Sequence, residues 1–194
     1  MRISRWGVCA LTSPFCHPSV SGDVRVCHPR GCLRGCLFED HSGGFRVEPL
    51  DLDDVTLVGH SAGGYLALWA AGRSCLEPGD PGSGPVVVPC TVVTQAAMVD
   101  QYSAAAGNLG GGVIEGFLGG GHGDVPNHYR VASPSASDAR IITVHGRYDL
   151  VVPAGRSGLL AGTEGIFDDA GTHFDVLDPQ HDLWRRTLDA LGLS

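Results

Sequence analysis

The sequence predicts an α/β fold in which helices flank a parallel β-sheet. Short apolar runs rich in β-branched residues recur at 55–58, 86–94, 140–144 and 165–168, as in strands that are buried on both faces. Segments that suit helices separate these runs, and the last helix, at about 180–191, carries an apolar stripe. Strands that alternate with helices pair in parallel through right-handed crossovers, so catalytic groups are expected at the carboxyl ends of the strands.

A sharp turn is expected between the first strand and the first helix. The strand at 55–58 ends at Gly59, and a helix is expected to follow over about 62–72. Residues 77–85, rich in Pro and Gly, form a loop, and the strand region 86–94 begins near Pro89.

The second half contains a Gly-rich stretch, 99–130, which suits a lid or cap over a pocket. Two short helical patches are expected within it, near 100–106 and 111–118. After the strand at 140–144, a short helix is expected at 153–161 and a weak strand at 165–168.

Residues 1–45 differ from the rest of the chain in composition and in hydrophobic pattern. They are rich in Pro, Ser, Gly, Cys and Arg and show neither strand nor helix periodicity. We expect residues 1–45 to be poorly ordered and residues 46–194 to form the folded domain. The strand at 55–58 is then expected to lack a partner on one side, which leaves an open sheet edge.

The composition limits the function. A chain of 194 residues suits one domain, and its net charge of −8 argues against binding to nucleic acid or to an anionic membrane. The chain has no Lys, which excludes a lysine Schiff base and a Walker-type phosphate loop. No apolar run approaches the roughly 20 residues of a membrane span. We expect a cytoplasmic protein without a cofactor.

The chain has seven cysteines, and five of them lie before residue 37. Cys27, His28, Cys32 and Cys36 can in principle supply four metal ligands, but their spacing fits no familiar zinc motif. The sequence therefore predicts no metal site.

A Gly-x-Ser-x-Gly motif occupies residues 59–63, between the strand at 55–58 and the following helix. In that context the turn lifts the hydroxyl of Ser61 clear of the sheet, and Ser61 is the candidate nucleophile. The backbone N–H of Ala62, at the start of the helix, points to where an oxyanion forms. The alternative is a Gly-rich turn in which Ser61 only caps the helix.

A nucleophilic serine needs a base, and the base needs an acid that orients it. Asp149 follows the strand at 140–144, and His173 follows the weak strand at 165–168. Their order after Ser61 is that of a Ser-Asp-His triad. The alternatives are a turn-capping Asp149 and an exposed loop His173. The side chain of His60 is expected to point away from the triad and to serve in packing or in support of the site residues. His145 is expected to support the turn at Asp149.

The segments 55–64, 145–153 and 171–175 resemble the nucleophile, acid and base segments of the α/β-hydrolase superfamily. The resemblance covers about residues 52–192, and small esterases of the kynurenine formamidase-like and dienelactone hydrolase-like groups are the most similar. It implies hydrolysis of a small ester or amide through Ser61, Asp149 and His173.

Members of this superfamily have several strands before the nucleophile, and a His-Gly-Gly loop among them supplies the second oxyanion donor. Here about 54 residues precede the strand, and the similar residues 41–44 lie close to Ser61 in sequence. We therefore expect an incomplete N-terminal half and weakened activity. The alternative is a non-catalytic remnant of the fold that acts as a binding module.

Overall fold

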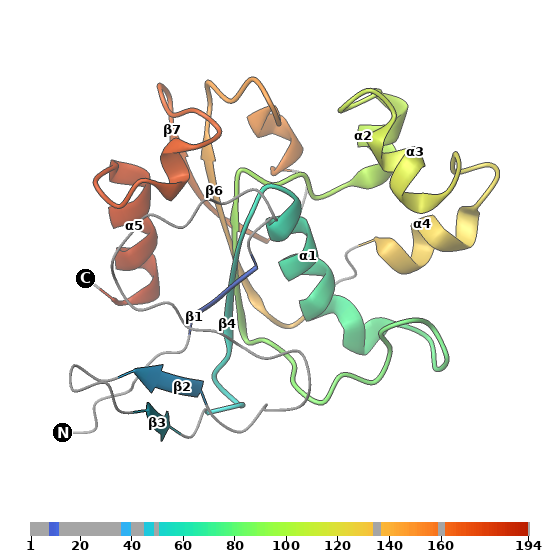
Figure 1. Cartoon of the computed structure of the whole chain (residues 1–194). Helices are drawn as coiled ribbons and strands as arrows, with labels where there is room; N and C mark the ends of the chain where they lie inside the picture. The colour runs from blue at the N-terminus through green and yellow to red at the C-terminus, as the bar shows by residue number, and fades with distance from the viewer. Residues whose placement is uncertain are drawn as a thin grey trace.

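The computed structural model describes residues 51–133, 137–158 and 162–193, together with the backbone of three short strands before residue 50. Its centre is a five-stranded sheet in the order β1-β4-β5-β6-β7, and all four pairs of neighbouring strands are parallel (Figure 1). The strands are β1 (Val8–Leu11), β4 (Thr56–His60), β5 (Thr91–Gln95), β6 (Arg140–Gly146) and β7 (Glu164–Asp168). The predicted fold class is therefore confirmed.

The open edge expected at the strand before Gly59 is wrong. β1 pairs in parallel with β4, and Val8 lies opposite Thr56 while Leu11 lies opposite Gly59. This pairing gives β4 a hydrogen-bonded neighbour on both sides. The four-residue run of β1 is too short to show a strand period, which is why the sequence did not reveal it.

A second, two-stranded antiparallel sheet joins β2 (Cys36–Glu39) to β3 (Phe45–Glu48). The remaining residues of the 1–45 segment lie outside the part that the structure describes, so the expectation of poor order there stays a prediction.

Helices cover the sheet on both sides. α1 (Ala62–Ala71) lies on one face and α5 (Asp182–Leu191) on the other (Figure 1). Each helix encloses a core of its own: Ala67 and Leu68 of α1 pack with Val92, and Leu183 of α5 packs with Val93. The adjacent valines of β5 point to opposite faces because side chains alternate along a strand. Burial on both faces explains the unbroken apolar runs in the sequence.

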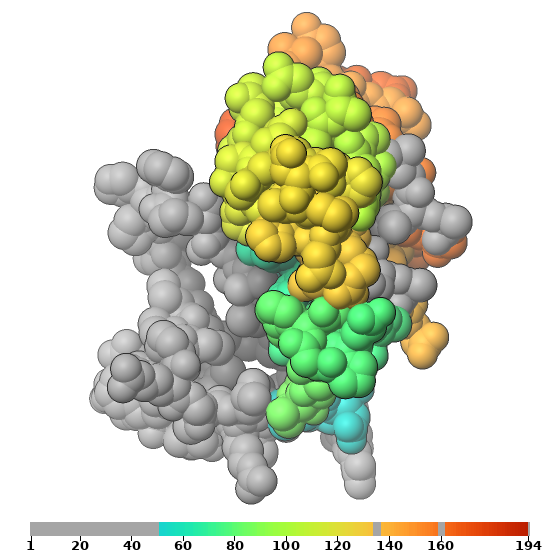
Figure 2. Space-filling model, turned by 90° about the vertical axis from the view of Figure 1, so that its right-hand side faces the viewer, coloured from blue at the N-terminus to red at the C-terminus, as the bar shows by residue number. Residues whose placement is uncertain are grey.

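Three short helices form a separate layer, which we call the cap: α2 (Gln101–Ala106), α3 (Val113–Leu118) and α4 (Pro126–Ala132). They enclose their own apolar cluster around Ala104, Ile114, Leu118 and Tyr129. In Figure 2 the cap, coloured yellow-green to yellow, forms one continuous patch on the face turned to the viewer. The sequence predicted α2 and α3 but not α4, whose seven residues begin at a proline within the Gly-rich stretch.

Hydrogen bonds and one ion pair hold the cap to the body. The hydroxyl of Tyr65 on α1 donates to the Gln101 side chain at 2.7 Å, and Trp69 Nε1 donates to the Val131 carbonyl at 2.8 Å. Arg130 forms a two-pronged ion pair with Asp80, with N–O distances of 2.8 and 2.7 Å. This pair lowers the pKa of Asp80 because the guanidinium donates to the carboxylate.

Short 3-10 turns complete the fold: η1 (Gly72–Cys75), η2 (Ala154–Arg156) and η3 (Asp175–Leu177). Of the helix expected at 153–161, the described residues contain only the turn η2. Among the parts of the chain that the structure describes, no helix has the length and apolar character needed to cross a membrane.

Candidate active site

Ser61 lies on a strained turn between β4 and α1. Its backbone has φ 53° and ψ −120°, a conformation that residues with a side chain rarely adopt. Its N–H donates to the carbonyl of Gln95 at 2.7 Å, which ties the turn to the end of the neighbouring strand. This geometry is that of a nucleophile elbow, in which the turn exposes the serine at the carboxyl end of the sheet.

The turn can be this tight because Gly59 has no side chain. A Cβ atom at Gly59 would lie 2.2 Å from the carbonyl oxygen of Gly63, so the end of β4 and the first turn of α1 could not approach this closely. The spacing of glycines in the motif therefore follows from a backbone contact.

Ser61 precedes α1, but its side chain makes no capping hydrogen bond. The alternative, a serine that only caps the helix, is not supported, and the hydroxyl is not engaged in capping. Ala62 is the first residue of α1, so its N–H has no acceptor within the helix. Together with the positive end of the helix, this N–H is suited to bind an oxyanion.

Asp149 and His173 meet at the carboxyl ends of β6 and β7. His173 Nδ1 lies 2.7 Å from Asp149 Oδ2, and the two residues are only 5% and 4% exposed. Burial alone raises the pKa of the Asp149 carboxyl, but hydrogen bonds from His173, Val152 and Val151 outweigh it and hold the pKa below its usual value. Asp149 is therefore an ionised acceptor that fixes the imidazole of His173.

A close backbone contact brings the two loops together. Gly146 ends β6, and a Cβ there would lie 2.0 Å from the carbonyl oxygen of Gly171, two residues before His173. The N–H of Tyr148 donates to that same carbonyl at 3.0 Å. The short segment between Pro153 and His173 is thus sufficient to place the histidine beside Asp149.

His145 supports Asp149 from below, as the sequence predicted. Its Nε2 lies 3.0 Å from Asp149 Oδ2 and 2.8 Å from the carbonyl oxygen of Val152, so Nε2 carries the proton. Its Nδ1 lies 2.8 Å from Ser157 Oγ, and the ring is fully buried. The turn that carries Asp149 is therefore held by its own backbone N–H groups and by a buried histidine.

The direction expected for the His60 side chain is wrong, although its expected supporting position is found. Its Nε2 donates to the backbone carbonyl of His173 at 2.9 Å, and the centroids of the two rings are 4.7 Å apart. Burial lowers the pKa of His60, partly offset by this hydrogen bond, so the neutral ring donates through Nε2. A residue of the elbow thus contacts the loop of the base, a contact between distant segments that no local pattern indicates.

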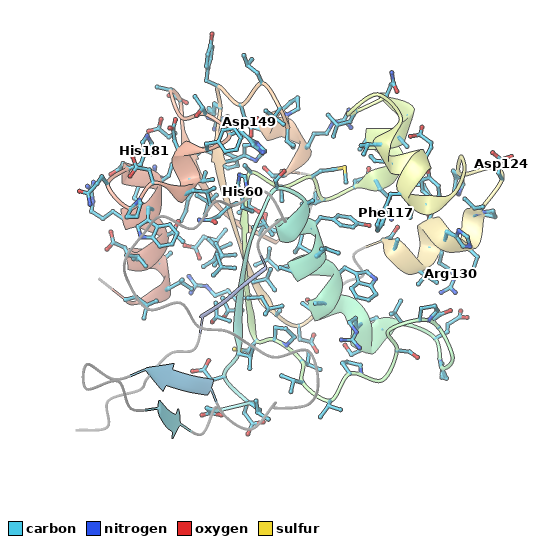
Figure 3. All side chains as sticks on the ribbon, in the orientation of Figure 1. His60, Phe117, Asp124, Arg130, Asp149 and His181 are labelled. Carbon is cyan, nitrogen blue, oxygen red and sulfur yellow. The ribbon has the colours of Figure 1, made fainter. Side chains whose placement is uncertain are left out.

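Figure 3 labels His60 at the end of β4 and Asp149 on the loop after β6, while Phe117 and Arg130 lie on the cap. Since His60 is hydrogen-bonded to His173, and His173 to Asp149, the turn at Ser61 shares one end of the fold with these two residues. Among the hydrogen bonds of the described residues, none joins Ser61 Oγ to His173.

The remaining histidines of the described residues lie away from this site, and most of the possible metal ligands before residue 37 lie outside those residues. His122 and His128 are exposed on the cap, and His181 caps α5. The segment 41–44, as well as Cys27, His28 and Cys32, falls outside what the structure describes. In the described part of the chain, no three His, Cys, Asp or Glu side chains are placed to hold a metal ion.

No family model matches the chain, and no curated protein matches it. Solved structures do match. An acylaminoacyl peptidase from Pyrococcus horikoshii aligns with a TM-score of 0.54 and 19% identity, over 73% of this chain and 24% of that one. The bifunctional GH43-CE protein of Bacteroides eggerthii aligns with 0.57 and 21%, over 74% and 22%.

An acetyl ester-xyloside bifunctional hydrolase from Caldicellulosiruptor lactoaceticus aligns with a TM-score of 0.51 and 19% identity, over 74% of this chain and 59% of that one. The chain thus spans less than two thirds of the length of each of these proteins. At these identities the likeness shows the fold alone, and the fold is α/β-hydrolase-like.

Proposed function

We propose that this chain is a serine hydrolase that cleaves a carboxylic ester or amide through Ser61, His173 and Asp149. One observation carries the proposal: the buried Asp149–His173 pair lies at the carboxyl end of the sheet, where the strained turn exposes Ser61. A buried Asp-His pair at the same end of the sheet as a serine on such a turn is the arrangement that can activate a hydroxyl as a nucleophile.

The hydrogen bonds assign the tautomer of the base. Asp149 Oδ2 can only accept from His173 Nδ1, so the proton lies on Nδ1 and the lone pair lies on Nε2. Nε2 is then free to take the proton of Ser61 as the hydroxyl attacks the carbonyl carbon. The N–H of Ala62 donates to the developing oxyanion, and Asp149 stabilises the imidazolium.

Collapse of the tetrahedral intermediate breaks the bond to the leaving group, which takes the proton back from His173 Nε2. The acyl group remains on Ser61 Oγ. Water then attacks this ester while His173 again removes and returns one proton, and the acid product leaves with Ser61 restored. No cofactor takes part in this sequence.

We take the class of substrate from the family resemblance and from the names of the matching structures. Among the matching structures, one has a name that specifies a peptidase and another a name that specifies an acetyl ester hydrolase. The resemblance to small esterases and to formamidase-like enzymes favours a small ester or formyl amide. We therefore propose a small-molecule ester or amide as the substrate.

The test is hydrolysis of p-nitrophenyl acetate and of formanilide by the protein, a Ser61→Ala variant and a Ser83→Ala control. Ser83 lies in the loop after α1, outside the site. We expect the Ser61 variant alone to fall to the uncatalysed rate. Equal rates for the wild type and the Ser61 variant would overturn the proposal and favour a non-catalytic binding module.

A further inference from the structure

Four large apolar side chains are exposed beside the Asp149–His173 pair. Tyr148, Leu150 and Val151 are 63%, 83% and 55% exposed, and Phe174 is 64% exposed. We call these four residues the apolar rim. None of them belongs to the hydrophobic clusters of the described residues, so the packing of the fold does not explain them.

The rim and the catalytic pair alternate along the chain. Asp149 is buried between Tyr148 and Leu150, and its Oδ1 accepts from the Val151 N–H at 2.8 Å. This turn directs the carboxylate inward and leaves its apolar neighbours outside. The loop that carries Asp149 therefore also carries three exposed apolar side chains.

The base loop repeats this alternation. Phe174 follows the buried His173, and the centroids of the two rings are 5.0 Å apart. The ring of Phe174 also lies 5.9 Å from that of His60 on the elbow. The hydrogen bond from the Tyr148 N–H to the Gly171 carbonyl joins the two loops, so the four rim residues lie on the two joined loops that carry the catalytic pair.

Apolar side chains that stay in water give up the free energy that burial would provide. Single exposed apolar residues are ordinary, but four of them on the two joined loops of a reactive centre indicate a ligand that covers them. The ligand that must approach His173 and Ser61 in each reaction cycle is the substrate.

We propose that the apolar rim binds an alkyl or aromatic group of the substrate, so that the enzyme prefers esters with an extended apolar group to acetyl esters of small alcohols. This inference rests on the proposed function. Burial of one methylene changes an association constant about fourfold. Because an open rim covers a chain on one side, we expect kcat/KM to rise about two- to fourfold for each methylene added.

The apolar group can lie on the acyl side or on the alcohol side of the ester, and two substrate series separate these cases. In one series, p-nitrophenyl esters extend from acetyl to hexanoyl. In the other, acetate esters extend from ethyl to hexyl alcohol. The measured quantity is the slope of log kcat/KM against chain length.

The test variant is Leu150→Ser combined with Phe174→Ser. The matched control is Val86→Ser, since Val86 is 87% exposed and precedes β5 at the opposite end of the strand. We expect a positive slope in one series for the wild type and the control, and a flat slope for the double variant. Two flat slopes in the wild type, or a slope that the double variant keeps, would overturn the inference.

Binding of hexanol and octanol, measured by calorimetry, tests the rim without any hydrolysis. The Ser61→Ala variant should bind these alcohols as the wild type does, and the double variant should bind them at least tenfold more weakly. Equal binding by the double variant would contradict the rim, whatever the outcome for catalysis. A wild-type dimer that the double variant loses would assign the rim to a second copy of the chain and also overturn the inference.

Discussion

Replacement of Asp149 by Asn separates the effect on catalysis from the effect on stability. The carboxylate accepts four hydrogen bonds, and the structure shows what the substitution does to each of them. Oδ1 accepts from the N–H groups of Val151 and Val152, both at 2.8 Å, and an amide oxygen can do the same. The amide NH₂ then faces His173 Nδ1 and His145 Nε2. His145 retains the Val152 carbonyl at 2.8 Å as an acceptor.

His173 has no such second acceptor for Nδ1 within the described residues. It avoids an unpaired proton by moving it to Nε2, so that Nδ1 accepts from the amide. The loss of stability is then about 1 kcal/mol, or about 2–4 °C in Tm for a chain of this size. The base, however, has its proton on the nitrogen that must accept one from Ser61, and this defect lowers kcat about 10⁴-fold in a Ser-His-Asp triad.

The assay compares kcat and Tm of the wild type, Asp149→Asn and Asp178→Asn. Asp178 caps an exposed turn through a 2.8 Å bond to the Gln180 N–H and serves as the matched control. We expect only Asp149→Asn to lose activity, with a small change in Tm. A kcat within about threefold of the wild type, on a protein that is folded by its melting curve, would refute the assignment of Asp149 as the orienting acid.

Three further predictions concern the elbow, the base loop and acid stability. Gly59→Ala places a Cβ 2.2 Å from a backbone oxygen and should lower the free energy of unfolding by more than about 3 kcal/mol in urea titrations, while Gly116→Ala, with open space around it, should not. His60→Phe keeps a ring but removes the donor to His173, so kcat should fall about three- to tenfold with KM little changed; an unchanged kcat would contradict the positioning role. The native pKa of Asp149 is below its usual value, so its stabilisation is present above about pH 4 and is lost as the pH falls through the lower native pKa; Tm measured from pH 6 to 2.5 should decline less in Asp149→Asn.

Much of the geometry of the candidate site could be predicted because it follows from local patterns in the sequence. The motif around Ser61 requires glycines at fixed positions, since the backbone of the turn touches itself. Asp149 and His173 each follow a strand, and the carboxyl ends of parallel strands meet at one edge. Order along the chain was therefore enough to indicate which side chains share an end of the fold.

The features that were missed depend on contacts between distant segments. β1 forms a strand by pairing with β4, and its four residues are too few to show the alternation of a strand in the sequence. α4 is held by its packing in the cap and by the ion pair from Arg130 to Asp80, although it begins within a Gly-rich stretch. The contact from His60 to the His173 carbonyl joins segments 113 residues apart, so only the folded chain reveals it.

Reaction with a fluorophosphonate probe tests the central claim most directly, because the probe marks a serine only when an adjacent base activates its hydroxyl. The account predicts that the wild-type protein takes up one probe, that peptide mass spectrometry places it on Ser61, and that His173→Ala abolishes the labelling. A probe on a different serine, or labelling of Ser61 that persists in the folded His173 variant, would contradict it.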